Sequence, residues 1–389
     1  MSTAQRRSAT IVGLGMTELG KVFGRTTADL TVEAITRAVA DAGLTLGDVD
    51  GVLMSSGMAN DITPHLVADL GIERLSLLAA TSTFGAGAGA MIAQAARAIA
   101  DGSATTVVCT FADTPLQEGR RSAWGTSAAT PSGYRGWNFA TGATTPNVLY
   151  ALAARRHMEK YGTTSEHLAE IAVAQRKWAA GNPLAQFRDP ITVADHHASP
   201  WIAEPLHRLD CCLVSNGAIA VVVTSAERAA DLPQPPVHVW GYGEGHRPRR
   251  LARDSTWGLE TGAVSSGRIA LERAGIGLGD VDVVELYDCY TYTVLVSLED
   301  YGFCAKGEGG DFVSGGALAP GGRLAVNTGG GQLSSYYMWG YTPLSEAIIQ
   351  LRGAGGDRQA PRSDVALVSG NGGILEYHST MVLGRSEKQ

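Results

Sequence analysis

The segment AGLTLGDVDGVLM, residues 42–54, recurs in slightly changed form as AGIGLGDVDVVEL at residues 274–286. Each copy follows a stretch whose apolar residues have helical spacing, residues 28–43 and residues 265–275. Each unit therefore predicts a helix, a short turn, an acidic loop and a buried strand. Repetition on this scale indicates two similar α/β halves. The alternative is chance similarity in a common helix-to-strand turn.

Buried strands and helices alternate in the rest of the chain. Residues 9–16 and 104–112 are apolar runs with little alternation, as in strands that are covered on both faces. Residues 89–102 have helical spacing and end on a glycine, which is typical of a helix C-terminus. The second half repeats this order, with a helical pattern at 344–355 and a strand pattern at 364–373. This alternation predicts a mostly parallel sheet with helices on its faces.

The repeat also suggests a division of the chain into two units. We expect a first half over residues 1–231 and a second half over residues 232–389, joined by the proline-rich segment LPQPPVHV at 232–239. Residues from about 113 to about 210 contain further helical patterns and many turn residues. We interpret this stretch as an insertion over the active face, because insertions on a rigid α/β scaffold commonly form substrate sites.

Composition argues against several classes of protein. The 389 residues carry a net charge of -7 and the pI is about 5.7, so we expect no nucleic-acid partner, which would need a basic face. The sequence has no apolar run long enough for a membrane span, and its N-terminus lacks the apolar core of a signal peptide, so we expect a cytoplasmic protein. Its five cysteines include no CxxC pair, which argues against a disulfide framework and against a zinc site.

Three glycine-containing segments are candidates for a functional site. Residues 82–94, STFGAGAGAMIAQ, place a Gly/Ala loop before a helix, where backbone N–H groups suit an anion or a carbonyl oxygen, although close helix packing explains the small residues equally well. In residues 327–340, NTGGGQLSSYYMWG, a glycine run is followed by two adjacent tyrosines. Residues 369–384, SGNGGILEYHSTMVLG, form another glycine loop and then a strand with His378, a lone histidine of the kind that is more often structural.

Other motifs carry weaker signals. The glycines of GLGMTELG, residues 13–20, lack the spacing of a dinucleotide fingerprint. The histidines and cysteines of residues 195–212 match no common zinc spacing, so we favour a structural role for them and expect no metal. Tyr287 lies at the C-terminal end of the repeated strand, where α/β sheets place their ligands. Cys289 follows as a candidate nucleophile, with no histidine near it in sequence.

Together these segments resemble the thiolase superfamily, and most of all the sterol-carrier-protein-X thiolases and the lipid-transfer-protein aldolases. The likeness covers nearly the whole chain, and its most specific blocks are residues 182–220, 285–313 and 325–340. The resemblance implies an α/β thiolase fold, in which two pseudo-symmetric βαβαβαββ halves form a five-layered α/β/α/β/α core with a helical loop insertion. It also implies a homodimer or a higher oligomer.

The departures from the thiolase pattern concern its catalytic positions. The thiolase nucleophile falls at about Gly85, and the first cysteine of this chain is Cys109. The thiolase histidine falls on Tyr337, its following proline on Met338, and the thiolase Asn or His after the strand falls on Tyr287. Loss of the nucleophile together with two tyrosines resembles the steroid side-chain-cleaving acyl-CoA aldolases.

That resemblance implies retro-aldol C–C cleavage of a β-hydroxyacyl-CoA, giving a ketone and a shorter acyl-CoA such as propionyl-CoA without a covalent acyl-enzyme. It implies no cofactor beyond the CoA of the substrate, and a partner protein with a zinc ribbon and an OB-fold. The CoA phosphates could meet Arg120, Arg121 or the basic segment 246–253, each of which is otherwise a solvated surface group. Two rivals stay open: an acyltransferase or thiolytic enzyme that uses Cys289, and a non-catalytic thiolase-like subunit that binds acyl-CoA.

Within this hypothesis, we expect Tyr287 and Tyr337 to flank the β-oxygen, one as base and one as hydrogen-bond donor, with His378 as a lower-ranked relay. A tyrosine base at neutral pH needs a lowered pKa or a proton relay, because its ordinary pKa is about 10. The residues expected to bind the substrate or to hold the thioester oxygen are Gly85, Gly87, Asn327, Gly330, Gly331, Gly372 and Gly373.

Overall fold

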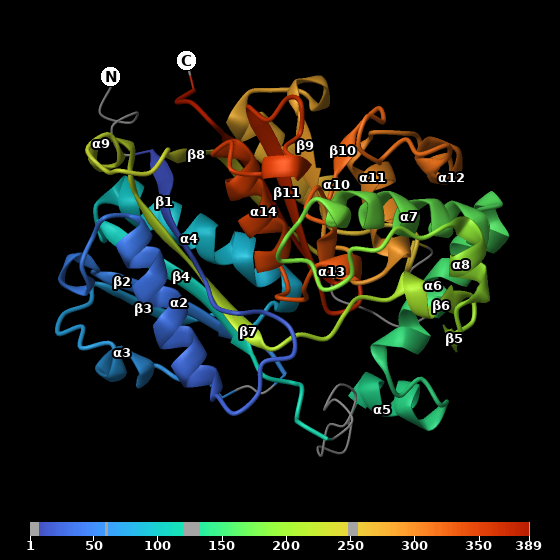
Figure 1. Cartoon of the computed structure of the whole chain (residues 1–389), viewed down its shortest axis with the longest axis horizontal. Helices are drawn as coiled ribbons and strands as arrows, with labels where there is room; N and C mark the ends of the chain where they lie inside the picture. Colours follow the sequence, from blue (N-terminus) through green and yellow to red (C-terminus); the bar gives the residue numbers. More distant parts are fainter. Residues whose placement is uncertain (1–7, 59–60, 120–132, 248–255, 389) are drawn as a thin grey trace.

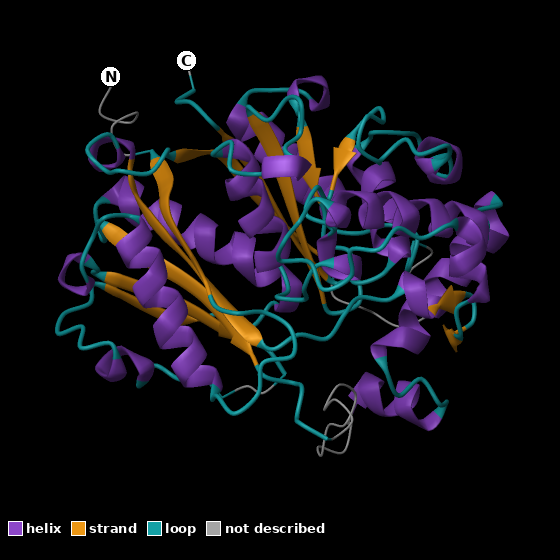
Figure 2. Ribbon diagram, viewed as in Figure 1, coloured by secondary structure: helices purple, strands orange, loops and turns teal. Residues whose placement is uncertain are grey.

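A computed structural model describes residues 8–58, 61–119, 133–247 and 256–388 of the chain (Figure 1). Its main strands form two groups, one from each half of the sequence (Figure 2), and a short antiparallel pairing of Thr10 and Ile11 with His238 and Val237 joins them into one ten-stranded sheet. The first group has the order β3-β2-β4-β7-β1, and the second has the order β10-β9-β11-β12-β8. The first group consists of β1 (Ala9–Met16), β2 (Gly51–Ser56), β3 (Leu77–Ala80), β4 (Thr106–Asp113) and β7 (Gly217–Ser225). The second consists of β8 (Val237–His246), β9 (Val283–Glu285), β10 (Ala325–Val326), β11 (Val365–Gly372) and β12 (Tyr377–Gly384).

The two groups repeat the same strand pairing. In the first, β2 runs parallel to β3 and β4, and β7 runs antiparallel to β4 and β1. In the second, β9 runs parallel to β10 and β11, and β12 runs antiparallel to β11 and β8. The repeated sequence forms the same turn twice, Leu46–Asp48 before β2 and Leu278–Asp280 before β9. The predicted pair of similar halves is therefore confirmed.

Helices cover both faces of each group of strands. The helices of this core are α2 (Thr27–Asp41), α3 (Leu66–Asp69), α4 (Gly87–Asp101), α9 (Ala226–Ala229), α10 (Ala263–Ala274), α11 (Thr291–Tyr301), α12 (Gly309–Val313), α13 (Gly331–Ser334) and α14 (Tyr341–Leu351). Alternate residues of β4 face two different cores, because successive strand residues point to opposite faces. Val108 and Ala112 pack in the core with α2, while Cys109 and Phe111 pack in the core with α4.

Helix α4 lies between the two groups of strands. It contacts β4 and β7 of the first half and β8 and β12 of the second. Helix α14 shares this central layer. The ring of Tyr341, at its start, stacks on the ring of Phe111 in β4 with the centroids 6.2 Å apart, and the helix also contacts β9 and β11. Helix α2 covers the outer face of the first sheet, and α10 covers the outer face of the second. The predicted order of five layers is therefore confirmed.

Local sequence explains where these helices begin and end. Helix α2 follows Thr26, whose hydroxyl accepts the N–H of Asp29 while the Asp29 carboxylate accepts the N–H of Thr26, a reciprocal capping box. Helix α4 ends at Asp101 and is capped by Gly102, which has a φ of 81°. The predicted glycine end is confirmed, because this left-handed conformation is strained for residues with a Cβ.

The predicted insertion packs on the second half (Figure 1). It contains α5 (Gly133–Ala140), α6 (Pro146–Tyr161), α7 (Ser165–Ala180), α8 (Val193–Ala198), β5 (Trp201–Ala203) and β6 (Leu206–His207). Helix α7 contacts α11, α12 and α13. His157 of α6 lies with its Nε2 3.0 Å from Oε2 of Glu299 in α11, and both side chains are buried. The insertion therefore covers the loops that follow β9 and β10. The division of the chain at residues 231 and 232 stays a prediction.

Candidate active site

Two buried tyrosines from different loops meet in the second half. Tyr287 follows the end of β9, and Tyr337 lies in the loop between α13 and α14. Their Oη atoms are 2.9 Å apart, and their rings are edge to face with centroids 6.4 Å apart. Only 4% of Tyr287 and 5% of Tyr337 is exposed. The structure therefore brings together the two residues that the sequence placed at catalytic positions.

Both phenols of this pair are neutral at neutral pH. Burial raises the pKa of Tyr287 well above its ordinary value, and the nearby Cys289, Cys212 and Asp288 raise it further against the lowering effect of the hydrogen bond with Tyr337. Burial likewise raises the pKa of Tyr337, and Tyr287 adds to this effect. A tyrosine that acts as a simple base would need a lowered pKa, and this environment raises the pKa instead. The pair instead consists of one phenol that donates a hydrogen bond and one that accepts it.

Gly85 lies directly against the ring of Tyr287. A Cβ built on Gly85 would lie less than 3.0 Å from the ring carbons of Tyr287 and from the carbonyl oxygen of Asn371. Such a contact does not occur in folded proteins, so a side chain at this position would have to displace its neighbours. Tyr287 therefore fills the space into which a side chain of residue 85 would project.

The other predicted glycines of this region have different surroundings. The N–H of Gly87, at the start of α4, donates to the carbonyl of Phe84, so it is already used within the protein. A Cβ on Gly372 would meet the carbonyl oxygen of Thr83 at less than 3.0 Å, which shows how closely β11 packs on the turn before α4. Gly373 begins the turn between β11 and β12 with a φ of 61°. Their predicted contacts with the thioester stay predictions.

Three of the five described non-glycine residues with positive φ lie in the segments around the tyrosine pair. Phe84 before Gly85, Trp339 after Tyr337 and Asn327 after β10 all have positive φ values, of 52°, 48° and 50°. The rings of Phe84 and Trp339 are 5.7 Å apart. Non-glycine residues in this conformation cost about 1–3 kcal/mol each and gather at functional sites. The strain therefore marks the same region as the tyrosine pair.

The glycine loop after β10 is anchored on the end of β9. Oδ1 of Asn327 accepts the N–H of Leu286 at 2.6 Å, and the N–H of Gly330 donates to the carbonyl of Asn327 at 2.8 Å. Gly331 has a φ of 59°, and a Cβ there would lie less than 3.0 Å from the carboxylate of Asp288. The structure thus uses these three predicted residues to support the loop, and their contact with substrate stays a prediction.

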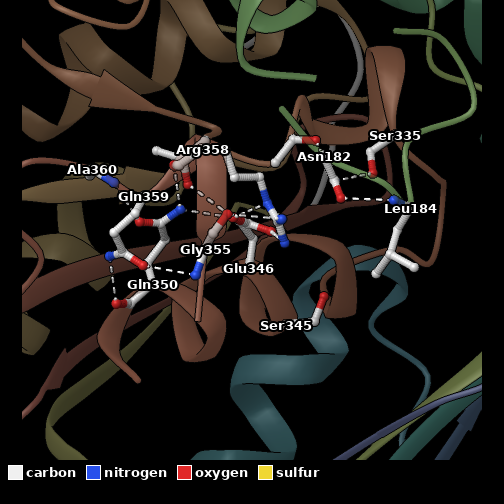
Figure 3. Close-up of polar contacts among 12 residues, drawn as sticks. Asn182, Leu184, Ser335, Ser345, Glu346, Gln350, Gly355, Arg358, Gln359 and Ala360 are labelled. Carbon is white, nitrogen blue, oxygen red and sulfur yellow. Dashed lines mark hydrogen bonds and ion pairs between the residues drawn. The ribbon is translucent and has the colours of Figure 1, made fainter. Parts of the chain in front are cut away.

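Two further sets of buried polar contacts lie near this loop, one around Glu346 and one around Asn182 (Figure 3). Glu346 of α14 accepts hydrogen bonds from Nε of Arg358 at 2.9 Å and from its Nη2 at 3.2 Å. The Nδ2 group of Asn182, just after α7, donates to the carbonyl of Gly329 at 2.8 Å and to Oγ of Ser335 at 3.1 Å. The loop that carries Tyr337 is therefore held by the second half and by the insertion together.

Two family models match this chain over most of its length. Residues 9–227 match the N-terminal domain of thiolase, and residues 243–385 match the thiolase C-terminal domain-like model. The chain belongs to the thiolase family. This result confirms the family expected from the sequence and agrees with the five-layered core.

Several thiolase-family proteins are similar to this chain. The steroid side-chain-cleaving aldolase of Thermomonospora curvata is 39% identical over 381 residues, covering 94% of this chain and 95% of that protein. The 17-hydroxy-3-oxo-4-pregnene-20-carboxyl-CoA lyase of Mycobacterium tuberculosis is 38% identical over 373 residues, covering 94% and 96%. The solved structure of the Ltp2-ChsH2(DUF35) aldolase superposes with a TM-score of 0.89 and 37% identity, covering 99% of this chain and 100% of that chain. The likeness to the aldolase branch of the thiolase family is therefore confirmed.

Cys289 is the cysteine that a rival thiolase-family mechanism would use. Burial raises the pKa of its thiol to about 12, and the thiol interacts with Tyr150 and Thr293. In the part of the chain that the structure describes, no histidine hydrogen-bonds to it. A buried thiol with a raised pKa is a poor nucleophile, because the thiolate is the reactive form. The rival acyl-transfer interpretation therefore gains no support from the geometry.

His378 belongs to a different polar network from the tyrosine pair. Its Nε2 lies 2.9 Å from Oγ of Ser369 and 3.1 Å from Oη of Tyr301. Burial lowers the pKa of this histidine to about 3. Within the described residues, its ring makes no hydrogen bond to either tyrosine of the pair. Its relay role stays a prediction that this geometry does not favour.

Some residues near the pair were not identified from the sequence. Tyr150 of α6 interacts with the Cys289 thiol, and its ring centroid is 4.5 Å from that of Tyr290. The N–H of Cys212 donates to the carbonyl of Cys289 at 3.0 Å. Tyr150 occurs in an ordinary helical pattern of the insertion, so only the packing of α6 on the second half shows its position.

The remaining candidates lie outside the site or outside the described residues. His196 and Asp210 pair at 2.8 Å between Nε2 and Oδ1, and both are buried. Among the described residues, no group of three potential ligands could hold a metal ion, and no helix is long and apolar enough to cross a membrane. Arg120, Arg121 and residues 248–255 of the basic segment fall outside the described residues.

Proposed function

We propose that this chain catalyses retro-aldol cleavage of a β-hydroxyacyl-CoA, in particular a steroid side-chain CoA thioester with a tertiary hydroxyl. The products are a ketone and a shorter acyl-CoA such as propionyl-CoA, and no covalent acyl-enzyme forms. The observation that carries this proposal is the 2.9 Å contact between the Oη atoms of Tyr287 and Tyr337. It is supported by the names of the two similar proteins, an aldolase and a CoA lyase.

A pair of neutral phenols is sufficient for this reaction. In retro-aldol cleavage the bond between the α and β carbons breaks, and its electron pair passes to the enolate of the thioester. The proton of the β-hydroxyl leaves the oxygen, and one proton is added to the α carbon. The net change therefore moves a proton from oxygen to carbon. It does not require a catalytic residue that is ionised before the reaction begins. A hydrogen-bonded phenol pair can take up one proton while it releases another.

The direction of proton transfer follows from which tyrosine meets the β-oxygen. In one concerted step, that phenol accepts the hydroxyl proton and passes its own proton to its partner, while the partner gives its own proton to the α carbon of the enolate. The raised pKa of both groups keeps them protonated before and after the cycle. The pair is almost fully buried, and surroundings of low polarity strengthen hydrogen bonds to the developing charge.

The thioester oxygen needs donors while it carries enolate charge. We propose that backbone N–H groups around Gly85 and Gly372–Gly373 supply them, because Gly85 packs beside the ring of Tyr287 and Gly372 packs on the turn that contains Gly85. Gly87 is a weaker candidate, since its N–H donates to Phe84. No step of this mechanism requires a cofactor other than the CoA of the substrate.

We propose that the chain works in a complex. One solved structure that matches the chain over almost its full length is the Ltp2-ChsH2(DUF35) aldolase, whose name joins two proteins. An equivalent partner with a zinc ribbon and an OB-fold, on a homodimer of this chain, is the assembly that this likeness supports.

The proposal is tested with a panel of β-hydroxyacyl-CoAs that differ in side-chain length and in substitution at the β carbon. The chain is assayed alone and with the DUF35 protein, and products are identified by mass spectrometry. We expect a ketone and a shorter acyl-CoA from substrates with a tertiary hydroxyl. Intact substrate under every condition would show that the chain is a binding subunit.

A further inference from the structure

Three residues around Tyr287 hold the loop that carries Tyr337. Oε1 of Glu285 accepts from the N–H and the hydroxyl of Thr328, at 3.0 and 2.7 Å. The N–H of Leu286 donates to Asn327, as described above. The third anchor is the carboxylate of Asp288, the residue that directly follows Tyr287. Tyr287 therefore lies between two connections from its own segment to the glycine loop.

The Asp288 anchor is fully buried and makes several hydrogen bonds. Its Oδ1 and Oδ2 are each 2.9 Å from the N–H of Gln332, and Oδ2 is 3.2 Å from the N–H of Leu333. Gly331 leaves the room that this carboxylate occupies, because a Cβ there would meet Oδ2. Hydrogen bonds to a charged acceptor are stronger than neutral ones. The ionised carboxylate therefore binds the two segments together more firmly than a neutral group of the same shape.

Gln332 extends this connection to the residues around Tyr337. Its side-chain Nε2 donates to the carbonyl of Trp339 at 2.8 Å. On the other side, the N–H of Tyr337 donates to Oγ of Ser215 at 3.0 Å. A continuous path of hydrogen bonds thus leads from the residue after Tyr287 to the second residue after Tyr337.

We propose that Asp288 is a positioning residue of the proposed aldolase reaction, whose carboxylate acts through Gln332 and Trp339 to hold the two phenols in hydrogen-bond contact. The proposal rests on the proposed function, because it assigns a role within that reaction. A displacement of about 1 Å in a reacting group can lower a rate about 10²-fold. Loss of this anchor should therefore change kcat far more than KM.

The protonation of Asp288 makes the role measurable. Burial raises the pKa of Asp288 to about 7, against the lowering effect of the N–H groups of Gln332 and Leu333. The titratable groups that act on Asp288 or line the same small cavity are Glu285, Glu346, Tyr287, Tyr336, Cys212 and Cys289. Protonation would replace one acceptor oxygen by a donor that faces N–H groups. The anchor is therefore complete only above a pH of about 7, and kcat should rise as Asp288 ionises.

The test compares Asp288→Asn with Glu285→Gln, which changes the neighbouring anchor. We expect Asp288→Asn to lower kcat about 10²-fold at pH about 8, to change KM by less than about threefold, and to remove the acid limb of the kcat profile. Among the described residues, Oε1 of Glu285 accepts from Thr328 and makes no hydrogen bond to Gln332, so the amide variant of Glu285 should retain the limb that Asp288 sets. Asp288→Asn with wild-type kcat and an unchanged limb would overturn the proposal.

A second variant tests the path without touching the buried carboxyl group. Gln332→Met keeps the backbone N–H that Asp288 binds and removes the amide that holds Trp339. We expect a lower kcat with the acid limb retained, and wild-type kcat would overturn the connection to Tyr337. This variant decides the matter if Asp288→Asn does not fold. Failure of the wild-type protein to cleave any β-hydroxyacyl-CoA would instead overturn the proposed function, which the wild-type assay shows separately.

Discussion

The phenolic oxygens of Tyr287 and Tyr337 lie 2.9 Å apart although 50 positions separate the residues in the chain. One tyrosine lies just after a strand of the second half, and the other lies in the loop that follows a neighbouring strand. Neither is a resting phenolate, because burial raises the pKa of both. The two phenols serve catalysis by passing a proton between their oxygens. Each hydroxyl should therefore be needed for activity, whereas a phenylalanine at either position should still allow the protein to fold.

The first prediction concerns the two hydroxyls. Tyr287→Phe and Tyr337→Phe should each lower kcat for cleavage by about 10²–10⁴-fold, the range for loss of a proton-transfer group. Each should reduce the free energy of unfolding by about 1–3 kcal/mol, because the remaining buried phenol loses its partner. Tyr336→Phe is the matched control, since Tyr336 bonds to Oγ of Ser345 at 3.0 Å and lies next to Tyr337 in sequence. Near-normal cleavage by both single variants would exclude the phenol relay.

The second prediction concerns the lost nucleophile. Gly85→Cys should not restore thiolase activity, because its side chain would collide with the ring of Tyr287 and the carbonyl of Asn371. We expect a loss of about 1–3 kcal/mol in the free energy of unfolding, measured by urea denaturation. Gly87→Cys is the control, because the nearest atoms to its Cβ are hydroxyl oxygens at 3.7 Å. The penalty at Gly85 should shrink in a Tyr287→Ala background, and an unchanged penalty would show that Tyr287 does not fill this space.

The third prediction separates the aldolase from the acyltransferase. Cys289→Ala should retain cleavage within about tenfold, and alkylation of the native enzyme at neutral pH should leave its activity intact, because burial raises the pKa of this thiol to about 12. The measurement is residual activity together with the mass of the intact protein after incubation with substrate. An acyl group trapped on Cys289, or complete inactivation on its alkylation, would favour the rival mechanism.

The fourth prediction concerns acid stability. Burial lowers the pKa of His378 to about 3 in the folded protein, whereas its ordinary value is about 6.5. Between these values the unfolded chain binds a proton that the folded one does not, so His378 makes stability fall as the pH decreases through this window. One such proton changes the free energy of unfolding by about 1.4 kcal/mol per pH unit. His378→Gln should reduce the slope by that amount between pH about 4.5 and about 6, and equal slopes would contradict the assignment.

The architecture could be predicted from the sequence for definite reasons. The repeat of residues 42–54 at 274–286 marks the same helix-to-strand turn in both halves, and apolar runs mark strands that are buried on both faces. The pairing of Tyr287 with Tyr337 followed from their correspondence with catalytic positions of a known family. Both inferences rest on patterns that are local in sequence or shared with relatives.

The support of the site could not be predicted in the same way. The bonds from Asp288 to Gln332 and from Asn182 to Gly329 join residues that no sequence period connects. The position of His378 was also hidden, because strand alternation gives two faces without showing which one meets the tyrosines. The raised pKa of the phenols depends on burial, which only the packed insertion and loops create.

The most direct measurement is the cleavage of a tertiary β-hydroxyacyl-CoA in the absence of free CoA, with both products quantified over one turnover. The phenol relay predicts ketone and shorter acyl-CoA in equal amounts at the wild-type rate, with no dependence on added CoA, and a loss of at least about 10²-fold in Tyr287→Phe and Tyr337→Phe. Cleavage that requires free CoA and proceeds through an acylated cysteine would contradict the account.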